Sequence, residues 1–378
     1  MNVCHLTSVH SKNDTRIFIK ECQSLRKFGH NVTYIVPNVP DSIENGVQIV
    51  GVDSHVTGQL DRILKTTKKV YEKALLVDAD IYHFHDPELM PIGLKLKSKG
   101  KKVIYDVHED VPEQILSKQW IPRPLRKLIS KLVKGYEKYA AKRFDAVVAA
   151  TPTIADRFRT YNVNTVTIHN YPLLDELSSE TYSTDKKGSN ALYIGGIYLL
   201  RGIKEMIMAV EKLNEHTKSE LVLAGAFAPA SLQNEVEDMT GWKYVDYRGF
   251  LNREEVKTAL SEASMGLVLL HPEPRFVVSL PIKMFEYMSA GIPVIASNFP
   301  LWESIVKNNE CGICVNPLNI EEITNAMKWI LDNPEEARKM GENGRKAVEN
   351  IFNWESESIR LLDLYGEIGQ VKEVSANN

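Results

Sequence analysis

The segment from Pro272 to Pro300 limits the possible folds more than any other stretch of the sequence. Pro281 suits the first turn of a helix, where its missing N–H costs nothing, and Gly291 with the proline two residues later would end that helix. We therefore predict a helix over residues 281–290 and a buried strand over residues 293–297. A loop, a helix and a buried strand in this order favour a parallel α/β sheet, in which a helix N-terminus offers free backbone N–H groups to an anion.

Two charged residues interrupt the apolar surface of this short predicted helix. Lys283 and Glu286 are three residues apart, so they lie on the same stripe of the helix. They form either a solvated ion pair on an otherwise buried helix or two contacts to a ligand. The helix alone leaves both interpretations open.

The rest of the chain repeats the alternation of strands and helices. A length of 378 residues exceeds one ordinary core, and 43% apolar with 25% charged residues is normal for a globular chain. Strand-like runs alternate with amphipathic helices in both halves, and a polar stretch without apolar periodicity separates the halves. The predicted fold is α/β with two doubly wound, Rossmann-like domains. The predicted parts are a first domain, a linker, a second domain, and a final helix with a tail, at residues 1–172, 173–190, 191–352 and 353–378, respectively.

Polar side chains follow consecutive predicted strands of the first half. His85 and Asp86 follow one strand, and His108 follows the next. A single histidine at such a place is more often structural, but two polar strand ends in succession indicate a site, because open α/β sheets bind ligands at the carboxyl ends of strands. His10 and Arg16 lie in the loop after the first strand, where they form either a solvated loop with a helix cap or part of an acceptor site.

The sequence SLPIKMFEYMSAGIPVIAS at residues 279–297 resembles the donor-nucleotide signature of the retaining group 1 (family 4) glycosyltransferases. That family has the GT-B fold, in which two doubly wound domains face a central cleft. The resemblance implies that amides near Ser279 and Leu280 hold the donor diphosphate and that Glu286 bonds the ribose hydroxyls. The family carries another glutamate eight residues earlier, where this chain has Val278.

A second unit with a family resemblance opens the second half of the chain. Gly195 and Gly196 follow a predicted strand and precede a helix, and Arg201 stands where the family places a phosphate-binding lysine. Without the resemblance, a plain strand-to-helix turn explains this pattern equally simply. The remaining residues implied by the resemblance are Phe250 and Leu251 at the nucleotide base, Lys283 at the diphosphate, and His108 beside the donor sugar.

The function predicted from this resemblance is a metal-independent, retaining glycosyltransferase of the hexosyltransferase type. The donor is expected to be a nucleotide diphosphate sugar, and the acceptor a saccharide, lipid-linked in cell-surface polysaccharide synthesis. No carboxylate cluster in the sequence suggests a divalent ion, so no metal and no cofactor is expected, and Arg201 and Lys283 would neutralise the leaving diphosphate. His108, Arg201 and Glu286 are the predicted catalytic residues. The alternatives are a sugar-nucleotide epimerase and a non-catalytic subunit that binds nucleotide sugars.

Charge is distributed unevenly along the chain. Residues 1–172 contain 26 Lys and Arg against 18 Asp and Glu, a net charge of +8, whereas residues 173–378 contain 20 against 31, a net charge of −11. The segment 118–143 has nine basic residues and one acidic residue, and its apolar residues recur at helical spacing. This segment either docks on an anionic membrane surface or packs its apolar stripe on the sheet. No nucleic-acid-binding motif accompanies the basic half.

The expected location is the cytoplasm, with possible peripheral attachment to the inner face of the cell membrane. The sequence contains no apolar run near the roughly 20 residues that span a bilayer. The pair Cys311 and Cys314 has the spacing of a redox or metal site, but no second ligand pair or thioredoxin-like unit accompanies it. The cysteines are therefore expected to be reduced and structural.

Overall fold

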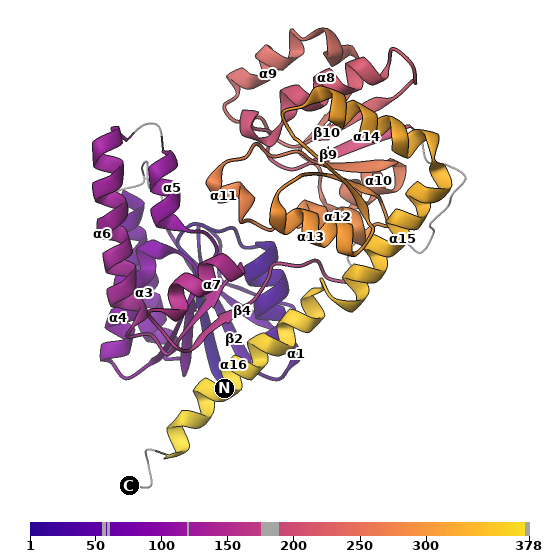
Figure 1. The fold of residues 1–378 in the computed structure, drawn as a ribbon. Coiled ribbons are helices and arrows are strands. Elements are labelled where there is room, and N and C mark those ends of the chain that lie inside the picture. The colour runs from indigo at the N-terminus through magenta and orange to yellow at the C-terminus, as the bar shows by residue number, and fades with distance from the viewer. Residues whose placement is uncertain (55–57, 59–60, 119–120, 175–188, 375–378) are drawn as a thin grey trace. The chain divides into compact units, whose positions relative to one another are not determined.

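The computed structural model describes residues 1–54, 58, 61–118, 121–174 and 189–374. The chain divides into two compact units (Figure 1). Unit 1 contains Met1–Asn170 and Glu355–Asn378, and unit 2 contains Tyr171–Trp354. Most of the predicted linker, residues 173–190, lies outside the described residues.

Unit 1 is built on an eight-stranded sheet with the order β3-β4-β2-β1-β5-β6-β7-β8. All neighbouring strands are parallel except β3 and β4. The strand order reverses between β1 and β5, which is where open sheets of this type bind ligands. The strands are β1 Asn2–Leu6, β2 Asn31–Pro37, β3 Ser42–Glu44, β4 Val47–Val52, β5 Ile81–Phe84, β6 Lys102–Val107, β7 Ala146–Ala149 and β8 Thr165–Thr167.

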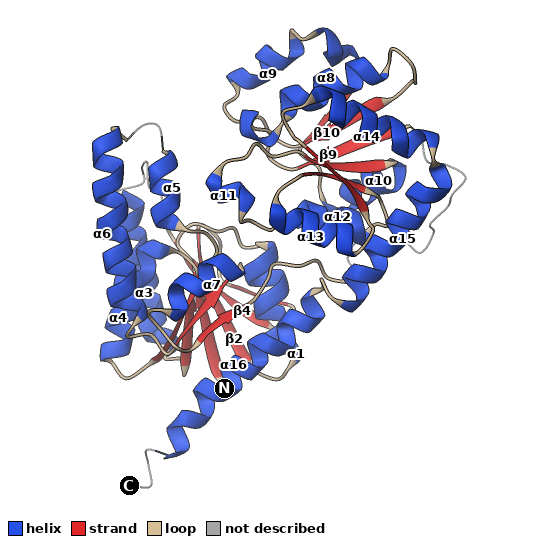
Figure 2. Cartoon of the chain, in the orientation of Figure 1, coloured by secondary structure: helices blue, strands red, loops and turns tan. Residues whose placement is uncertain are grey.

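Helices cover both faces of the unit 1 sheet (Figure 2). A π-helical segment, Thr15–Cys22, continues directly into α1, and α16 comes from the far end of the chain. The helices are α1 Gln23–Lys27, α3 Thr67–Val77, α4 Met90–Ser98, α5 Val111–Ser117, α6 Arg123–Ala141, α7 Pro152–Arg159 and α16 Trp354–Val374. Shorter helical segments, Arg62–Thr66 and Pro87–Leu89, precede α3 and α4.

Unit 2 is built on a six-stranded, fully parallel sheet with the order β11-β10-β9-β12-β13-β14. Its order reverses between β9 and β12. The strands are β9 Asn190–Ile194, β10 Glu220–Ala224, β11 Val245–Gly249, β12 Met265–Val268, β13 Val294–Ser297 and β14 Gly312–Val315. The helices are α8 Ile203–Leu213, α9 Ser231–Glu237, α10 Arg253–Glu262, α11 Pro274–Val277, α12 Ile282–Ser289, α13 Pro300–Asn308, α14 Ile320–Asp332 and α15 Pro334–Asn350, with short turns at Leu199–Arg201 and Thr240–Tyr244.

Each unit has its own hydrophobic core. In unit 2, Leu192 of β9 belongs to the cluster on one face of the sheet, whereas Ala191 and Tyr193 belong to the cluster on the other face. Successive strand residues point to opposite faces, so a sheet covered on both faces needs the continuous apolar runs seen in the sequence. The predicted α/β class with two doubly wound domains is confirmed.

The segment that most limits the fold adopts the predicted order of elements. The predicted helix over residues 281–290 is α12, with Pro281 as its N-cap instead of within its first turn, and the predicted strand over residues 293–297 is β13. All four cysteines are free. Among the described residues, no helix is both long and apolar enough to cross a membrane.

Candidate active site

Glycines at the carboxyl end of β9 bring the backbone of unit 2 close to charged side chains. Gly195 has a φ of +122°, and a Cβ atom there would lie 3.2 Å from Lys283 Nζ. Gly202, before α8, has a φ of +75°, and a Cβ there would lie 2.1 Å from the carbonyl oxygen of Leu269. Only glycine fits these two positions without strain, so the turn that holds Arg201 depends on them.

Two cations converge on this turn. Lys283 Nζ is buried and has no hydrogen-bond partner among the described residues, and it lies 3.5 Å from the centroid of the Tyr193 ring. Arg201 Nη1 donates to the carbonyl oxygen of Gly196 at 3.1 Å. Burial, together with the charge of Arg201, lowers the pKa of Lys283 well below its usual value. An anion bound here would favour the ammonium form of Lys283 and pair with it.

Glu286 does not pair with Lys283, although the two share a stripe of α12. Its carboxylate accepts a hydrogen bond from Arg253 Nη1 at 2.9 Å, and its side chain is 12% exposed. Arg253 is the first residue of α10, and sequence reasoning missed it because nothing local connects it to α12. The solvated Lys283–Glu286 ion pair considered from the sequence is therefore not formed in this structure.

The loop before α12 is fixed by hydrogen bonds to its backbone. The carbonyl oxygen of Ser279 accepts from Trp302 Nε1 at 2.6 Å, and Ser279 Oγ donates to the carbonyl oxygen of Phe276 at 2.9 Å. Leu280 is half-buried beside it. On the neighbouring loop after β11, Phe250 is 85% exposed. The adjacent Leu251 is half-buried against the core.

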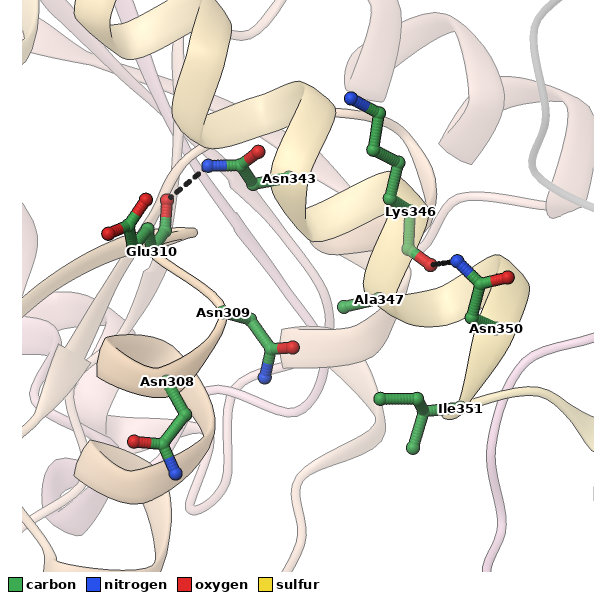
Figure 3. A pocket seen from close by; sticks show the side chains of 8 residues that line it. All are labelled: Asn308, Asn309, Glu310, Asn343, Lys346, Ala347, Asn350 and Ile351. Carbon is green, nitrogen blue, oxygen red and sulfur yellow. Dashed lines mark hydrogen bonds between the residues drawn. The ribbon is translucent and has the colours of Figure 1, made fainter.

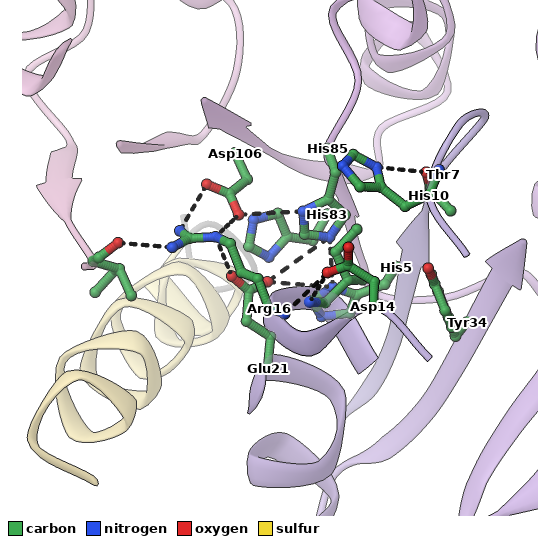
Figure 4. Close-up of polar contacts among 12 residues, drawn as sticks. His5, Thr7, His10, Asp14, Arg16, Glu21, Tyr34, His83, His85 and Asp106 are labelled. Atoms are coloured by element: carbon green, nitrogen blue, oxygen red, sulfur yellow. Dashed lines mark hydrogen bonds and ion pairs between the residues drawn. The ribbon is translucent and has the colours of Figure 1, made fainter. Parts of the chain in front are cut away.

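In unit 1, Asp106 at the end of β6 connects most of the polar strand-end residues (Figure 4). Arg16 donates to both of its oxygens, at 2.9 and 3.0 Å, and a third guanidinium N–H donates to the carbonyl oxygen of Ile168. His85 Nδ1 and His108 Nε2 lie 3.2 and 3.0 Å from Asp106 Oδ2. Burial alone would raise the pKa of Asp106, but Arg16 and His108 hold it well below its usual value.

A second carboxylate, Asp86, holds the loop after β1. It accepts hydrogen bonds from Thr7 Oγ1 at 2.7 Å and from the Ser8 backbone N–H at 2.6 Å, and it lies 3.1 Å from His10 Nδ1. Burial opposes protonation of His10, but the hydrogen bond and charge of Asp86 outweigh it and raise the pKa of His10. The rings of His10 and His108 lie 5.4 Å apart and are each partly exposed.

The predicted acceptor-side residues therefore differ in accessibility. Arg16 is 4% exposed and His85 3% exposed, and both are bonded within unit 1. His10 and His108 are the members of the group that a ligand of this unit could reach. The structure also adds His5, Glu21 and Tyr365 to the cluster, which sequence reasoning missed because they lie on three elements far apart in the chain.

A pocket of about 260 Å³ in unit 2 lies apart from these residues, between the end of α13 and α15 (Figure 3). Its side-chain amides are occupied by neighbouring carbonyl groups, since Asn343 donates to Glu310 and Asn350 to Lys346. None of the predicted site residues lines it. It gives no reason to move the candidate site.

Two α/β units, each built on a sheet of mainly parallel strands, define the chain as a protein of the GT-B class. The model of the glycosyl transferases group 1 matches residues 176–347, and that of glycosyltransferase family 4 matches residues 16–171. The chain belongs to the group 1 glycosyltransferases.

Relatives and solved structures are similar over most of the chain. An MMP alpha-(1->4)-mannosyltransferase of Mycolicibacterium hassiacum is 21% identical, covering 74% of this chain and 69% of the relative. O-antigen chain mannosyltransferase C of Escherichia coli is 22% identical, covering 80% and 78%. The sucrose-phosphate synthase structure from Thermosynechococcus elongatus has a TM-score of 0.76 at 19% identity, covering 98% and 99%. The predicted family and the GT-B fold are confirmed.

Proposed function

We propose that this glycosyltransferase moves a sugar from a nucleoside diphosphate sugar to a saccharide acceptor with retention of configuration, and that its donor site uses no divalent ion. The observation that carries the proposal is the buried Nζ of Lys283, which has no hydrogen-bond partner among the described residues, beside Arg201 at the start of α12. Breaking the bond between the sugar and the diphosphate adds charge to the leaving phosphate. Fixed cations and free backbone N–H groups in a buried site stabilise this developing charge more than they stabilise the intact donor.

The unit 2 residues divide between the parts of the donor. Gly195 and Gly196 let the diphosphate approach the backbone, and the amides near Ser279 and Leu280 bind it at the start of α12. Glu286, held by Arg253, accepts from the ribose hydroxyls. The main chain at Phe250 and Leu251 binds the base, and the exposed Phe250 ring offers a surface on which it can stack.

In unit 1, we assign His108 to the donor sugar and His10 to the acceptor. Asp106 accepts from His108 Nε2, so it fixes the ring orientation and leaves Nδ1 for a ligand. Asp86 favours the charged form of His10, which suits an acceptor that carries phosphate. Arg16 and His85 then act by holding Asp106, since neither is exposed enough to touch a substrate.

The acceptor we propose is a lipid-linked saccharide at an anionic membrane surface, in the synthesis of a cell-surface polysaccharide. The exposed face of α6 supports this choice. Leu125, Leu128 and Leu132 are 47%, 54% and 64% exposed, and exposed lysines lie beside them at helical spacing. The residues of α6 that face inward include Glu137, which pairs with Arg157 at 2.7 Å. The O-antigen mannosyltransferase among the relatives fits the same kind of product.

A donor panel tests the donor proposal. UDP-, GDP- and dTDP-sugars are screened by thermal shift, and each stabilising donor is then tested for transfer to lipid-linked acceptors with EDTA present. We expect one nucleotide class to stabilise the protein and to support transfer, and His108→Ala to reduce turnover about 100-fold or more with little loss of stability. Donor turnover without acceptor would indicate an epimerase, and binding without transfer a non-catalytic subunit.

Vesicle sedimentation tests the membrane proposal. Changing Lys127, Lys131 and Lys134 to Glu should abolish binding to vesicles of anionic lipid and leave the binding of nucleoside diphosphate unchanged. Changing three partly exposed lysines of unit 2, Lys204, Lys257 and Lys328, to Glu provides the charge-matched control. Equal binding of the α6 variant and the wild type would contradict the proposal.

A further inference from the structure

The centre of unit 1 contains a group of titratable side chains that the proposed transfer reaction does not use. His5 of β1, His83 of β5, His85 directly after β5, and Glu21 of the π-helical segment are all buried (Figure 4). The three imidazole centroids lie 4.8 to 5.2 Å from one another. Burial lowers the pKa of each histidine, so the rings are neutral, which is the form that binds metal ions.

Each of the three imidazoles has an outer partner for one of its ring nitrogens. His85 Nδ1 lies 3.2 Å from Asp106 Oδ2. His83 Nδ1 and His5 Nε2 lie 2.9 and 3.3 Å from Tyr365 Oη, which comes from α16. Histidines that bind metals characteristically donate their second N–H to such a carboxylate or oxygen, which fixes the tautomer and the ring orientation.

The remaining nitrogens of two rings converge with a carboxylate oxygen. His5 Nδ1 lies 3.0 Å from His85 Nε2, and the two nitrogens lie 3.7 and 3.8 Å from Glu21 Oε2. Tetrahedral ligands at zinc distances are separated by about 3.3 Å, so this triangle needs only small adjustments to bind an ion. An overlapping group of four residues offers one possible ligand atom each, and these four atoms lie within 4.8 Å of one another. The four residues are Glu21, His83, His85 and Asp106.

The same group has unsatisfied polar atoms. His83 Nε2 and both oxygens of Glu21 have no hydrogen-bond partner among the described residues. Arg16 Nε lies 3.0 Å from Glu21 Oε1, and Oε2 faces the histidines. Glu21 and Asp106 are two buried carboxyl groups beside one guanidinium, and a buried polar group without a hydrogen-bond partner, as at Glu21, is costly.

We propose that His5, His83, His85 and Glu21 bind one divalent ion of the zinc type as a structural centre of unit 1. Three imidazole nitrogens and one carboxylate oxygen would supply the four ligands of a closed, tetrahedral structural site. In the empty site, His5 Nδ1 donates to His85 Nε2. When the ion binds, that proton moves to His5 Nε2, which faces Tyr365. The ion joins β1, the end of β5 and the π-helical segment without entering the donor chemistry, and because its ligands are buried it enters while the chain folds.

Elemental analysis of the full chain tests this site without any transfer assay. The protein is produced in defined medium containing zinc and purified without metal-affinity resin. We expect roughly one zinc ion per chain, as one four-ligand site requires. Glu21→Gln and His83→Gln should lower the content at least several-fold. His169→Gln, which changes a histidine of the same unit bonded to Glu357 outside the cluster, should retain it.

Two measurements on the wild type keep the test decisive if those variants do not fold. Protein produced with cobalt should show the visible absorption bands of tetrahedral Co²⁺, and removing the metal under mild denaturation should lower the Tm. A zinc content below about a tenth of an ion per chain, with no cobalt bands, overturns the proposal. Unchanged metal content in both folded variants overturns the assignment of its ligands.

Discussion

The carboxyl edges of the two sheets differ in how their charges are compensated. In unit 1, Asp106 and Asp86 are surrounded by donors from the same unit, and Arg16 has acceptors for its N–H groups on two sides. In unit 2, Lys283 has no hydrogen-bond partner among the described residues, and Arg201 bonds the carbonyl oxygen of Gly196 and the side chain of Tyr193, not a carboxylate. Apart from Glu21 and His83 Nε2, the first edge is a self-satisfied network that stabilises its fold, whereas the second has cationic side chains with no carboxylate hydrogen-bonded to them among the described residues. An anionic ligand gains most from the second edge.

The largest effect should come from removing the cation of the self-satisfied edge. Arg16→Met leaves Asp106 and Glu21 buried without their guanidinium partner. Breaking a buried charge network in this way typically costs about 3–5 kcal/mol, so the urea midpoint should fall markedly. Lys283→Met is the matched change in unit 2. It should leave the protein at least as stable as the wild type, since it removes a buried amino group that has no hydrogen-bond partner among the described residues. Equal losses in the two variants would contradict the comparison.

Lys283→Met should instead weaken binding of the nucleoside diphosphate. A hydrogen bond to a charged group is worth about 1.5–3 kcal/mol, so the Kd should rise roughly 10- to 100-fold. Isothermal titration with UDP and GDP measures this change. Lys204→Met alters an exposed lysine of α8 that pairs with Glu235, and it should leave the affinity unchanged. A Kd for Lys283→Met within twofold of the wild type would place the diphosphate elsewhere.

The same lysine should couple nucleotide binding to pH. Burial and Arg201 lower the pKa of Lys283 in the free protein, and a bound diphosphate raises it again, so binding takes up a proton. Affinity should therefore fall as pH rises above the lowered pKa, by up to about tenfold per pH unit. Titrations near pH 8, where the phosphate is already ionised, in buffers of different ionisation enthalpy measure the uptake. Lys283→Met should abolish it, and uptake that persists would assign the proton to another group.

The fold and the elements around the proposed donor site were predictable because their signals are local. Pro281, Gly291 and the apolar run after them define α12 and β13 from about 20 neighbouring residues, and helical spacing alone places Lys283 and Glu286 on one stripe. The sequence could not show that Arg253 holds Glu286, since the two lie on different helices.

The unit 1 cluster was not predictable as a group, because it depends on strand pairing. His5 lies directly opposite His83 in the register of β1 and β5, and Tyr365 comes from the other end of the chain. Similarly, the periodicity of α6 predicts an amphipathic helix but not which face turns inward. The small residues Ser130 and Ala140, with the paired Glu137, face the unit, and this leaves the leucine stripe exposed.

The smallest effect should come from Glu286→Gln, which tests whether α12 recognises the ribose. The amide of glutamine still accepts a hydrogen bond, but it lacks the charge that strengthens both the ribose contact and the pair with Arg253. We expect a loss of about 1 kcal/mol, or roughly fivefold in affinity for the nucleoside diphosphate.

The 2′-deoxy nucleotide separates a lost ribose contact from a general disturbance of the site. Its affinity should already be lower in the wild type, and Glu286→Gln should lower it less. Arg253→Lys, which keeps a cation near Glu286, should lie between the wild type and Arg253→Ala. If Glu286→Gln binds the ribonucleotide as tightly as the wild type does, then α12 does not carry ribose recognition, and the donor assignment built on that helix is wrong.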